Sequence, residues 1–214
     1  TWVRFADQIF GKGDGQSRES RCEARDSIRV GDVRVIPEVI LEFAGGYLRP
    51  LKPEDVHPGY ASGLNDPEVN RYLQGVKRIT QTEKTVAEFV RHNQQADNAV
   101  LFGIWLDGIQ YHCGTVRLYG IETHHKTAHI GICLFYKSVW GKKLGYKTAT
   151  TVTQWAFDKL KLRWVEAGAY SENISSQKIF LAAGYKWVYD IPDKYILEGK
   201  PTTVKIYAAR NSCN

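Results

Sequence analysis

The sequence predicts a mixed α/β domain around one central sheet, on three observations. Strand-forming aromatic residues are plentiful, with 12 Tyr, 8 Phe and 6 Trp. Runs with helical periodicity alternate with apolar runs of strand length along most of the chain. At 214 residues, 43% of them hydrophobic, the chain can bury one core of ordinary size. Together these features favour helices packed on the faces of a single sheet.

The first half of the regular region reads as a strand followed by helices. Proline in a first turn and polar N-cap residues mark where helices begin. The expected elements are a strand at 47–51, a helix from 53 to about 64, a short helix from 65 to about 73, and a helix opened by Thr82.

The second half alternates strands and helices. Asp107-Gly108 is a hairpin turn signal between its first two strands, and Gly184 closes its last helix. The expected elements are strands at 100–106, 113–119 and 128–135, a helix to about 160, a strand at 164–170, a helix at 173–183, and strands at 185–189 and 203–208.

Residues 1–45 differ from the rest and predict an irregular N-terminal extension to a domain at 46–210. Charge, Gly and Ser mix there with little periodicity. Gly11, Gly13 and Gly15 have the spacing of a phosphate loop. Because neither a strand nor a helix flanks them, a flexible turn is the better interpretation.

Composition excludes several classes of function. The net charge of +6 suits nucleic acid, anionic lipid or a polyanionic cofactor. Because the basic residues form no blocks, a basic solvated surface is the simplest interpretation, and a nucleic-acid partner is not favoured. The four cysteines are scattered without metal or disulfide spacing. No apolar run approaches the roughly 18 residues of a membrane span, and no signal peptide is visible. We therefore expect a protein of the reducing cytoplasm that does not enter the membrane.

The segment from Ser138 to Thr148 predicts an anion site. Small and basic residues lie there between an apolar run and a helix-like run. A turn that leads into a helix directs several backbone N–H groups at one spot, and the helix dipole favours a phosphate there. Lys142, Lys143 and Lys147 add positive charge.

Five segments carry a resemblance to a known family. They are Leu48-Arg49-Pro50-Leu51 with Pro53-Glu54-Asp55; Leu64-Asn65-Asp66-Pro67-Glu68-Val69; Ala128-His129-Ile130-Gly131-Ile132; Trp140-Gly141-Lys142; and Asn173-Ile174-Ser175-Ser176 leading to Ala183-Gly184-Tyr185. In this order and spacing they resemble the GNAT superfamily of acyl-CoA-dependent N-acetyltransferases, above all its RimJ/RimL-like branch. The resemblance implies a mostly antiparallel mixed sheet with flanking helices, whose central strands splay apart to admit the pantetheine arm of CoA.

The resemblance also implies acetyl-CoA as co-substrate, without a metal. The family pattern Arg/Gln-x-x-Gly-x-Gly/Ala falls on Trp140, Lys143 and Gly145, so Lys143 departs from it. The backbone N–H of Lys143 can still donate to a phosphate if φ is negative. Alternatively, Lys143 is an exposed turn lysine and phosphate binding relies on the backbone alone. Asn173 matches a residue that holds the CoA arm, or it is a helix N-cap. The implied CoA-binding residues are Ile132, Leu134, Lys142, Lys143, Leu144, Gly145, Tyr146, Lys147 and Asn173.

For catalysis, relatives use a glutamate where this chain has His129, and an imidazole can accept a proton at neutral pH. The alternatives for His129 are packing and substrate binding. The tyrosine with which relatives protonate the CoA sulfur falls on Phe180, which has no proton to give. Ser176, Tyr185 or solvent would then replace it.

The acceptor is expected to be a primary amine on a small molecule or a protein N-terminus. Similar sequences favour an amino sugar of a nucleotide sugar, whereas the RimJ/RimL-like branch favours a protein N-terminus. A CoA-binding module without catalysis is a third possibility, and a homodimer is left open. Asp66, Arg71 and Tyr72 are the expected substrate-binding residues, although Asp66 also suits an N-cap. His112, His124 and His125 do not predict a metal, since adjacent turn histidines rarely reach one ion.

Overall fold

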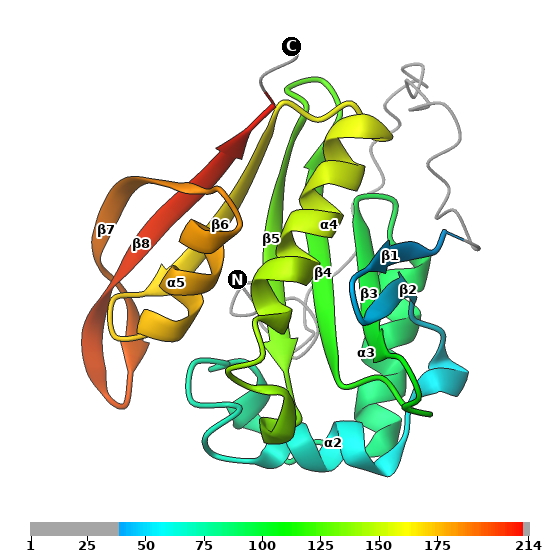
Figure 1. Cartoon of the computed structure of the whole chain (residues 1–214). Coiled ribbons are helices and arrows are strands. Elements are labelled where there is room, and N and C mark those ends of the chain that lie inside the picture. Colours follow the sequence, from blue (N-terminus) through cyan, green and yellow to red (C-terminus); the bar gives the residue numbers. More distant parts are fainter. Residues whose placement is uncertain (1–38, 212–214) are drawn as a thin grey trace, which may run out of the picture.

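A computed structural model describes residues 39–211 of the chain (Figure 1). Gly11, Gly13 and Gly15, together with Cys22, Cys213 and most of the expected N-terminal extension, lie outside the described residues. A strand begins at Leu41, within the range that the sequence analysis expected to be irregular.

One sheet of eight strands forms the centre of the domain, in the order β1-β2-β3-β4-β5-β6-β8-β7. Neighbouring strands run antiparallel except β5 and β6, which are parallel. The sequence-predicted fold class is thereby confirmed. The strands are β1 Leu41–Phe43, β2 Gly46–Pro50, β3 Ala99–Leu106, β4 Gly114–Glu122, β5 Thr127–Leu134, β6 Trp164–Tyr170, β7 Lys186–Leu197 and β8 Lys200–Arg210.

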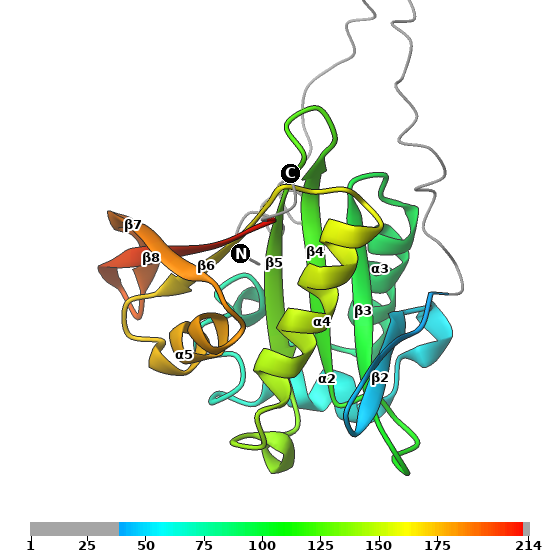
Figure 2. The same cartoon turned by 45° about the horizontal axis from the view of Figure 1, so that its top comes forward.

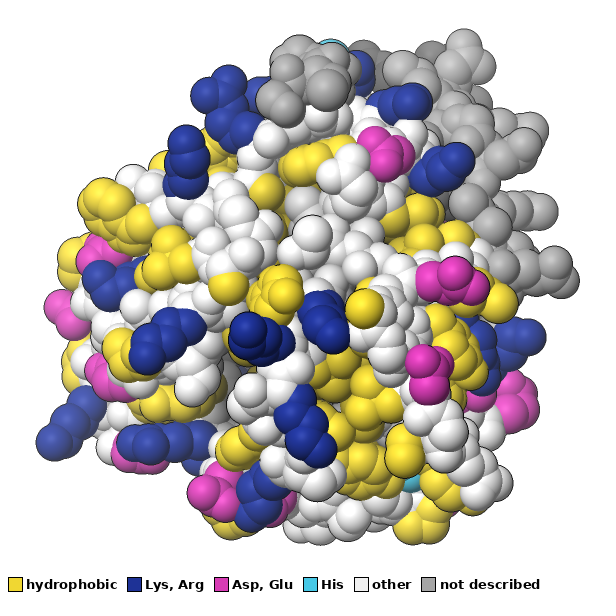
Figure 3. All heavy atoms as spheres, viewed as in Figure 1, with side chains coloured by type: hydrophobic (Ala, Val, Ile, Leu, Met, Phe, Trp, Pro, Cys, Tyr) yellow, Lys and Arg dark blue, Asp and Glu magenta, His cyan; other side chains and the backbone are white. Residues whose placement is uncertain are grey.

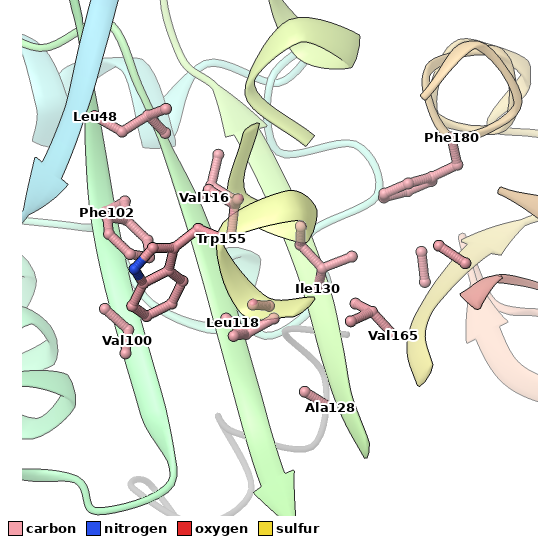
Figure 4. Packing of buried hydrophobic residues seen from close by; sticks show 14 of the residues in the cluster. Leu48, Val100, Phe102, Val116, Leu118, Ala128, Ile130, Trp155, Val165 and Phe180 are labelled. Carbon is pink, nitrogen blue, oxygen red and sulfur yellow. The ribbon is translucent and has the colours of Figure 1, made fainter. Parts of the chain in front are cut away.

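Helices cover both faces of the sheet (Figure 1). Helix α4 packs on one face, with Val152, Trp155 and Ala156 in a core shared with β3, β4, β5 and β6 (Figure 4). Helices α2 and α3 cover the other face. The helices are α2 Pro58–Asn65, α3 Glu83–Gln95, α4 Leu144–Asp158 and α5 Ile174–Ala182, with short 3-10 turns η1 Pro53–Asp55, η2 Val76–Arg78 and η3 Lys137–Val139.

The short helix expected from 65 to about 73 does not form. Asp66 is extended at ψ 124° and ends α2, as the residue before a proline tends to do. Its side chain accepts a hydrogen bond from the backbone N–H of Glu68 at 2.9 Å, which sets up a turn in place of a helical bond. Residues 66–75 therefore run as successive turns.

The last two strands are longer than the sequence indicated. They are joined at Glu198 and Gly199, which both have positive φ, of 51° and 80°. That pair of conformations matches the twist of a tight hairpin. From this turn the two strands extend to Lys186 and to Arg210, and their mutual pairing reaches Lys186 opposite Ala208.

The parallel strands β5 and β6 pair at one end only. Three residue pairs join them, and the last is His129 opposite Glu166. Beyond it the part made of β6, β8 and β7 diverges from β5 (Figure 2). Phe180 points from α5 toward Ile130 and Val165 on the two separating strands (Figure 4). The expected splay of the central strands is therefore present.

Within residues 39–211, no helix combines the length and the apolar character that a membrane crossing requires.

Candidate active site

The start of α4 has the geometry of an anion site. The first helical bond runs from the N–H of Lys147 to the carbonyl of Lys143, at 3.3 Å. The N–H groups of Leu144, Gly145 and Tyr146 precede it and have no acceptor within the helix. Lysine and arginine side chains lie over α4 and the turn that leads into it (Figure 3). Backbone donors, helix dipole and side-chain charge therefore favour a phosphate at this point.

Lys143 does not have the negative φ under which the sequence analysis expected it to serve. Its φ is 61°, in the left-handed region, and Gly141 two residues earlier has φ of 73°. A glycine is usual at such a position because it has no Cβ to clash with the following carbonyl. Lys143 adopts this left-handed conformation at some cost in strain, and its side chain is exposed.

Gly145 lies at the contact between α4 and α5. A Cβ added there would lie 2.6 Å from Cδ1 of Ile179. The two helices therefore approach closely at the first turn of α4. Leu144 beside it is buried in the core, and Tyr146 is half-buried.

The basic side chains of this segment have different surroundings. Lys142 is exposed. The ammonium of Lys147 donates instead to the carbonyl of Ala44, at 2.8 Å, and fastens α4 to the β1–β2 turn. Trp140, in the place of the family Arg or Gln, donates its indole N–H to the carbonyl of Leu134 at 2.9 Å. That bond folds the turn back onto the end of β5.

The edge of β5 that faces β6 is open to an extended ligand. Ile132 and Leu134 lie beyond the last residue pair with β6, and among residues 39–211 no strand pairs with that edge there. An unpaired strand edge offers backbone donors and acceptors, which suit an amide-bearing chain such as pantetheine. Asn173 caps α5 by accepting from the N–H of Ser176 at 3.1 Å, so the N-cap alternative is observed. The amide nitrogen of Asn173 is not used in that cap.

His129 lies at the point where the two strands part, on the face of β5 opposite α4. Its neighbours Ala128 and Ile130 belong to the core under α4, and strand side chains alternate between faces. The imidazole is half-exposed and stacks on Tyr119, with ring centroids 5.5 Å apart. Its Nδ1 lies 3.7 Å from Oε2 of Glu166. A Cβ added at Gly131, two residues on, would meet open space.

The two candidates for protonating the CoA thiolate differ in burial. Tyr185 is only 2% exposed, and its hydroxyl shares a hydrogen bond with the hydroxyl of Thr153 on α4. Burial raises the pKa of Tyr185 far above its usual value. A hydroxyl so enclosed is poorly placed to donate a proton to a bound ligand. Ser176 is half-buried in the first turn of α5 and stays a candidate. Phe180, in the place of the family tyrosine, is buried.

Residues 66–72, which we call the bridging segment, join the two sides of the split. On the β5 side, Lys137 forms ion pairs with Asp66 at 2.9 Å and Glu68 at 2.6 Å. On the β6 side, the hydroxyl of Tyr72 donates to the carbonyl of Glu172 at 3.1 Å. The bridging segment therefore crosses the end of the split toward which β5 and β6 diverge (Figure 1).

These contacts bear on the expected substrate-binding residues. Asp66 is already ion-paired, and the ammonium of Lys137 lowers its pKa. It is therefore less suited to an acceptor ammonium than the sequence indicated. Nε of Arg71 lies 3.7 Å from Oε1 of Glu198 on the β7–β8 turn. The Arg71 guanidinium lies over the ring of Tyr72. Asp66 thus contacts the β5 side of the split, whereas Arg71 and Tyr72 contact Glu198 and Glu172 on the other side.

The other histidines lie in two separate places. His112 is buried among aromatic rings, beside His57. His124 and His125 lie on the β4–β5 turn, where their backbone N–H groups donate to Glu122. Among residues 39–211, no cluster of three or more His, Cys, Asp and Glu side chains is arranged to hold a metal ion.

Comparison with known proteins identifies the family. Residues 47–186 match the family described as Acetyltransferase (GNAT) domain. The chain belongs to the GNAT acetyltransferases. It is an acetyl-transferring enzyme, and acetyl-CoA is its co-substrate.

Three relatives share little sequence with this GNAT protein. It is 23% identical over 171 residues to the uncharacterized N-acetyltransferase YoaA of Bacillus subtilis, covering 79% of this chain and 95% of YoaA. The RimL ribosomal alpha-N-protein acetyltransferase, solved with coenzyme A, superposes with a TM-score of 0.71 at 17% identity over 82% of this chain and all of that one. A spermidine N-acetyltransferase of Vibrio cholerae, solved with CoA and spermine, gives 0.70 at 16% identity over 79% of this chain and 98% of that one.

Sequence reasoning missed Glu166 and Tyr119, which contact His129, and Trp164, which donates to Glu166. Their relation to His129 depends on which residues face each other across strands, and one sequence carries no signal for that. It also missed Lys137, because its partners in the bridging segment are about 70 residues earlier in the chain.

Proposed function

We propose that this GNAT enzyme acetylates a primary amine by direct attack, with His129 as the general base. The observation that carries the proposal is the place of His129. It is the last residue of β5 that pairs with β6, and it faces away from α4. A thioester bound along the open β5 edge would lie next to His129. An acceptor would approach from the face of the sheet that His129 occupies, opposite α4.

The chemistry asks three things of the chain. The amine nitrogen must lose a proton, the thioester carbonyl must be polarised, and the thiolate must leave. His129 takes the proton, directly or through a water. Backbone N–H groups of the open β5 edge suit the carbonyl oxygen. The thiolate is protonated by solvent or Ser176, and since a free thiol has a pKa near 8.5 it leaves without a dedicated acid.

For the acceptor we favour a small molecule, an amino sugar carried by a nucleotide. The bridging segment supports this because it is fastened on both sides of the split by Lys137 and Tyr72. A long peptide would have to displace it, whereas a small amine would not. The net charge of +6 suits an anionic nucleotide as well as CoA. A structural neighbour, the microcin self-immunity acetyltransferase MccE, was solved with acetyl-CoA and AMP. That neighbour shows a nucleotide in a related fold.

The alternative acceptor is a protein N-terminus, which the RimL neighbour acetylates. A cytoplasmic location and a homodimer belong to this proposal as well. They fit either acceptor.

Thiol release from acetyl-CoA with a panel of amines tests the proposal. The panel is a UDP-linked amino sugar, spermidine, and a peptide with a free serine N-terminus. We expect the highest kcat/KM with the amino sugar. A higher value with the peptide would instead assign an N-terminal acceptor, and no release with any amine would contradict catalysis on these acceptors.

The base assignment has its own test. His129→Ala should lower kcat by about 100-fold or more while acetyl-CoA affinity, measured by calorimetry, stays unchanged. His124→Ala, a histidine on the exposed β4–β5 turn, is the matched control and should keep full activity. Full activity in His129→Ala would remove His129 from the mechanism.

A further inference from the structure

We propose that Glu166 is a positioning residue that fixes the tautomer and orientation of His129, and that Trp164 in turn orients Glu166. The inference rests on the proposed role of His129 as base. It assigns to this chain a carboxylate–imidazole pair carried on two strands.

The backbone fixes where Glu166 stands. It faces His129 on β5 in the last residue pair before the split, and it faces Ala208 on β8 on its other side. Paired on both edges, this residue of β6 cannot shift along the sheet without breaking two ladders. Its side chain and that of His129 lie side by side on the same face.

The carboxylate is oriented by Trp164, two residues earlier on the same face of β6. The indole N–H of Trp164 donates to Oε1 of Glu166 at 2.9 Å. The other oxygen, Oε2, then faces Nδ1 of His129 at 3.7 Å. Because an indole nitrogen can only donate, this bond holds one carboxylate oxygen and leaves the second for the histidine.

The imidazole is confined from the other side as well. The ring of Tyr119 on β4 stacks on it, with an interplanar angle of 28°. Gly120 comes so close that an added Cβ would lie 3.2 Å from Cδ2 of His129. Tyr119 and Glu166 therefore both contact the half-exposed ring.

A consequence for the chemistry follows from the two nitrogens. A carboxylate beside Nδ1 favours the tautomer that carries its proton there, and this leaves the lone pair on Nε2. In the transfer step the amine nitrogen bonds to the acetyl carbon, the carbon–sulfur bond breaks with its electron pair on sulfur, and the proton leaving the nitrogen goes to Nε2. The imidazolium that forms lies next to the Glu166 carboxylate, which stabilises it until the proton passes to solvent.

A double-mutant cycle on the amine of the panel that gives the highest rate tests this relation. Glu166→Gln should lower kcat by about 10-fold or more without changing KM for acetyl-CoA, because it acts through the base. In the His129→Ala background the same substitution should have no further effect. Glu88→Gln, an exposed carboxylate on α3, is the control and should change nothing. An equal loss in both backgrounds, or no loss in the single variant, would overturn the proposal.

A second readout does not depend on turnover. ¹⁵N NMR of histidine-labelled protein at pH 8.5, with His129 assigned by its absence in His129→Ala, should show the tautomer protonated at Nδ1. Glu166→Gln should shift the population toward the other tautomer, and Trp164→Phe should shift it partly. An unchanged spectrum in Glu166→Gln would refute the positioning role even if His129 proves to be the base. If no amine is turned over, the proposed function fails while this measurement still decides the inference.

Discussion

The buried histidine in the β3–β4 connection, His112, predicts that this enzyme loses stability in mild acid. His112 is 1% exposed and is packed against the rings of Tyr60, Trp105 and Phe135. Its Nε2 has no hydrogen-bond partner among the described residues. Burial, and secondarily the charge of His57, lowers the pKa of His112 from 6.5 to about 3. Protonation of this ring therefore favours the unfolded chain.

The magnitude follows from that difference. Because the pKa is lower in the folded state, the stabilisation is complete above pH 6.5 and is lost as the pH falls toward 3. The difference between 6.5 and about 3, at about 1.4 kcal/mol for each pH unit, amounts to about 5 kcal/mol. At pH 5 the loss is already about 2 kcal/mol. This loss is a substantial fraction of the roughly 5–15 kcal/mol by which a typical domain is stable.

Urea unfolding followed by tryptophan fluorescence at pH 7.5, 6 and 5 measures the effect. The wild type should lose about 2 kcal/mol between pH 7.5 and 5. His112→Phe keeps an aromatic ring in the same contacts without a titrating nitrogen, so most of that dependence should vanish. A smaller dependence of the same sign should remain from His57, whose pKa burial also lowers. His124→Phe is the matched control on an exposed turn. If His112→Phe kept the wild-type dependence on pH, the burial argument would be wrong.

Three further predictions concern the anion site and the helices around it. Gly145→Val should destabilise the fold by about 1–3 kcal/mol, because the valine side chain would overlap Ile179. A thermal-shift assay measures this loss, and adding Ile179→Ala should restore most of it. Lys143→Gly should raise the free energy of unfolding by up to about 1 kcal/mol, because it removes the strain of a left-handed backbone. The variant should keep its affinity for acetyl-CoA if the backbone binds the pyrophosphate. Lost affinity would show that the lysine ammonium contributes to binding. Tyr185→Phe should cost about 1–3 kcal/mol in urea unfolding, since Thr153 loses its partner, yet leave kcat unchanged; a fall in kcat with intact folding would reinstate the tyrosine as an acid.

Local patterns predicted most of the fold because they depend on neighbours along the chain. The hairpin signal at Asp107-Gly108 and the cap at Thr82 each specify a conformation within a few residues. The prediction of a short helix near Pro67 was wrong because another local signal competed with it. The Asp66 side chain offered the backbone a competing turn, and Lys137, from a distant part of the chain, holds it in place.

The surroundings of the candidate site depended on pairs that are far apart in sequence. Asn173 could be placed in advance because its cap bond spans three residues. The surroundings of Tyr185 could not be predicted in the same way, because its burial depends on the packing of Thr153 on α4 against it. The same holds for Lys147, whose charge suggested phosphate and whose observed partner is the carbonyl of Ala44.

By itself the sequence determined that a turn with glycine and lysine leads into a helix and favours an anion, and that His129 stands on the strand before it. Both are matters of local order, in which spacing along the chain fixes what the backbone can do. Only the tertiary structure decided that β5 and β6 separate just after His129, and that Glu166 faces it. Strand register is set by the whole sheet, since each pairing depends on the strands beyond it, and no single segment carries that information.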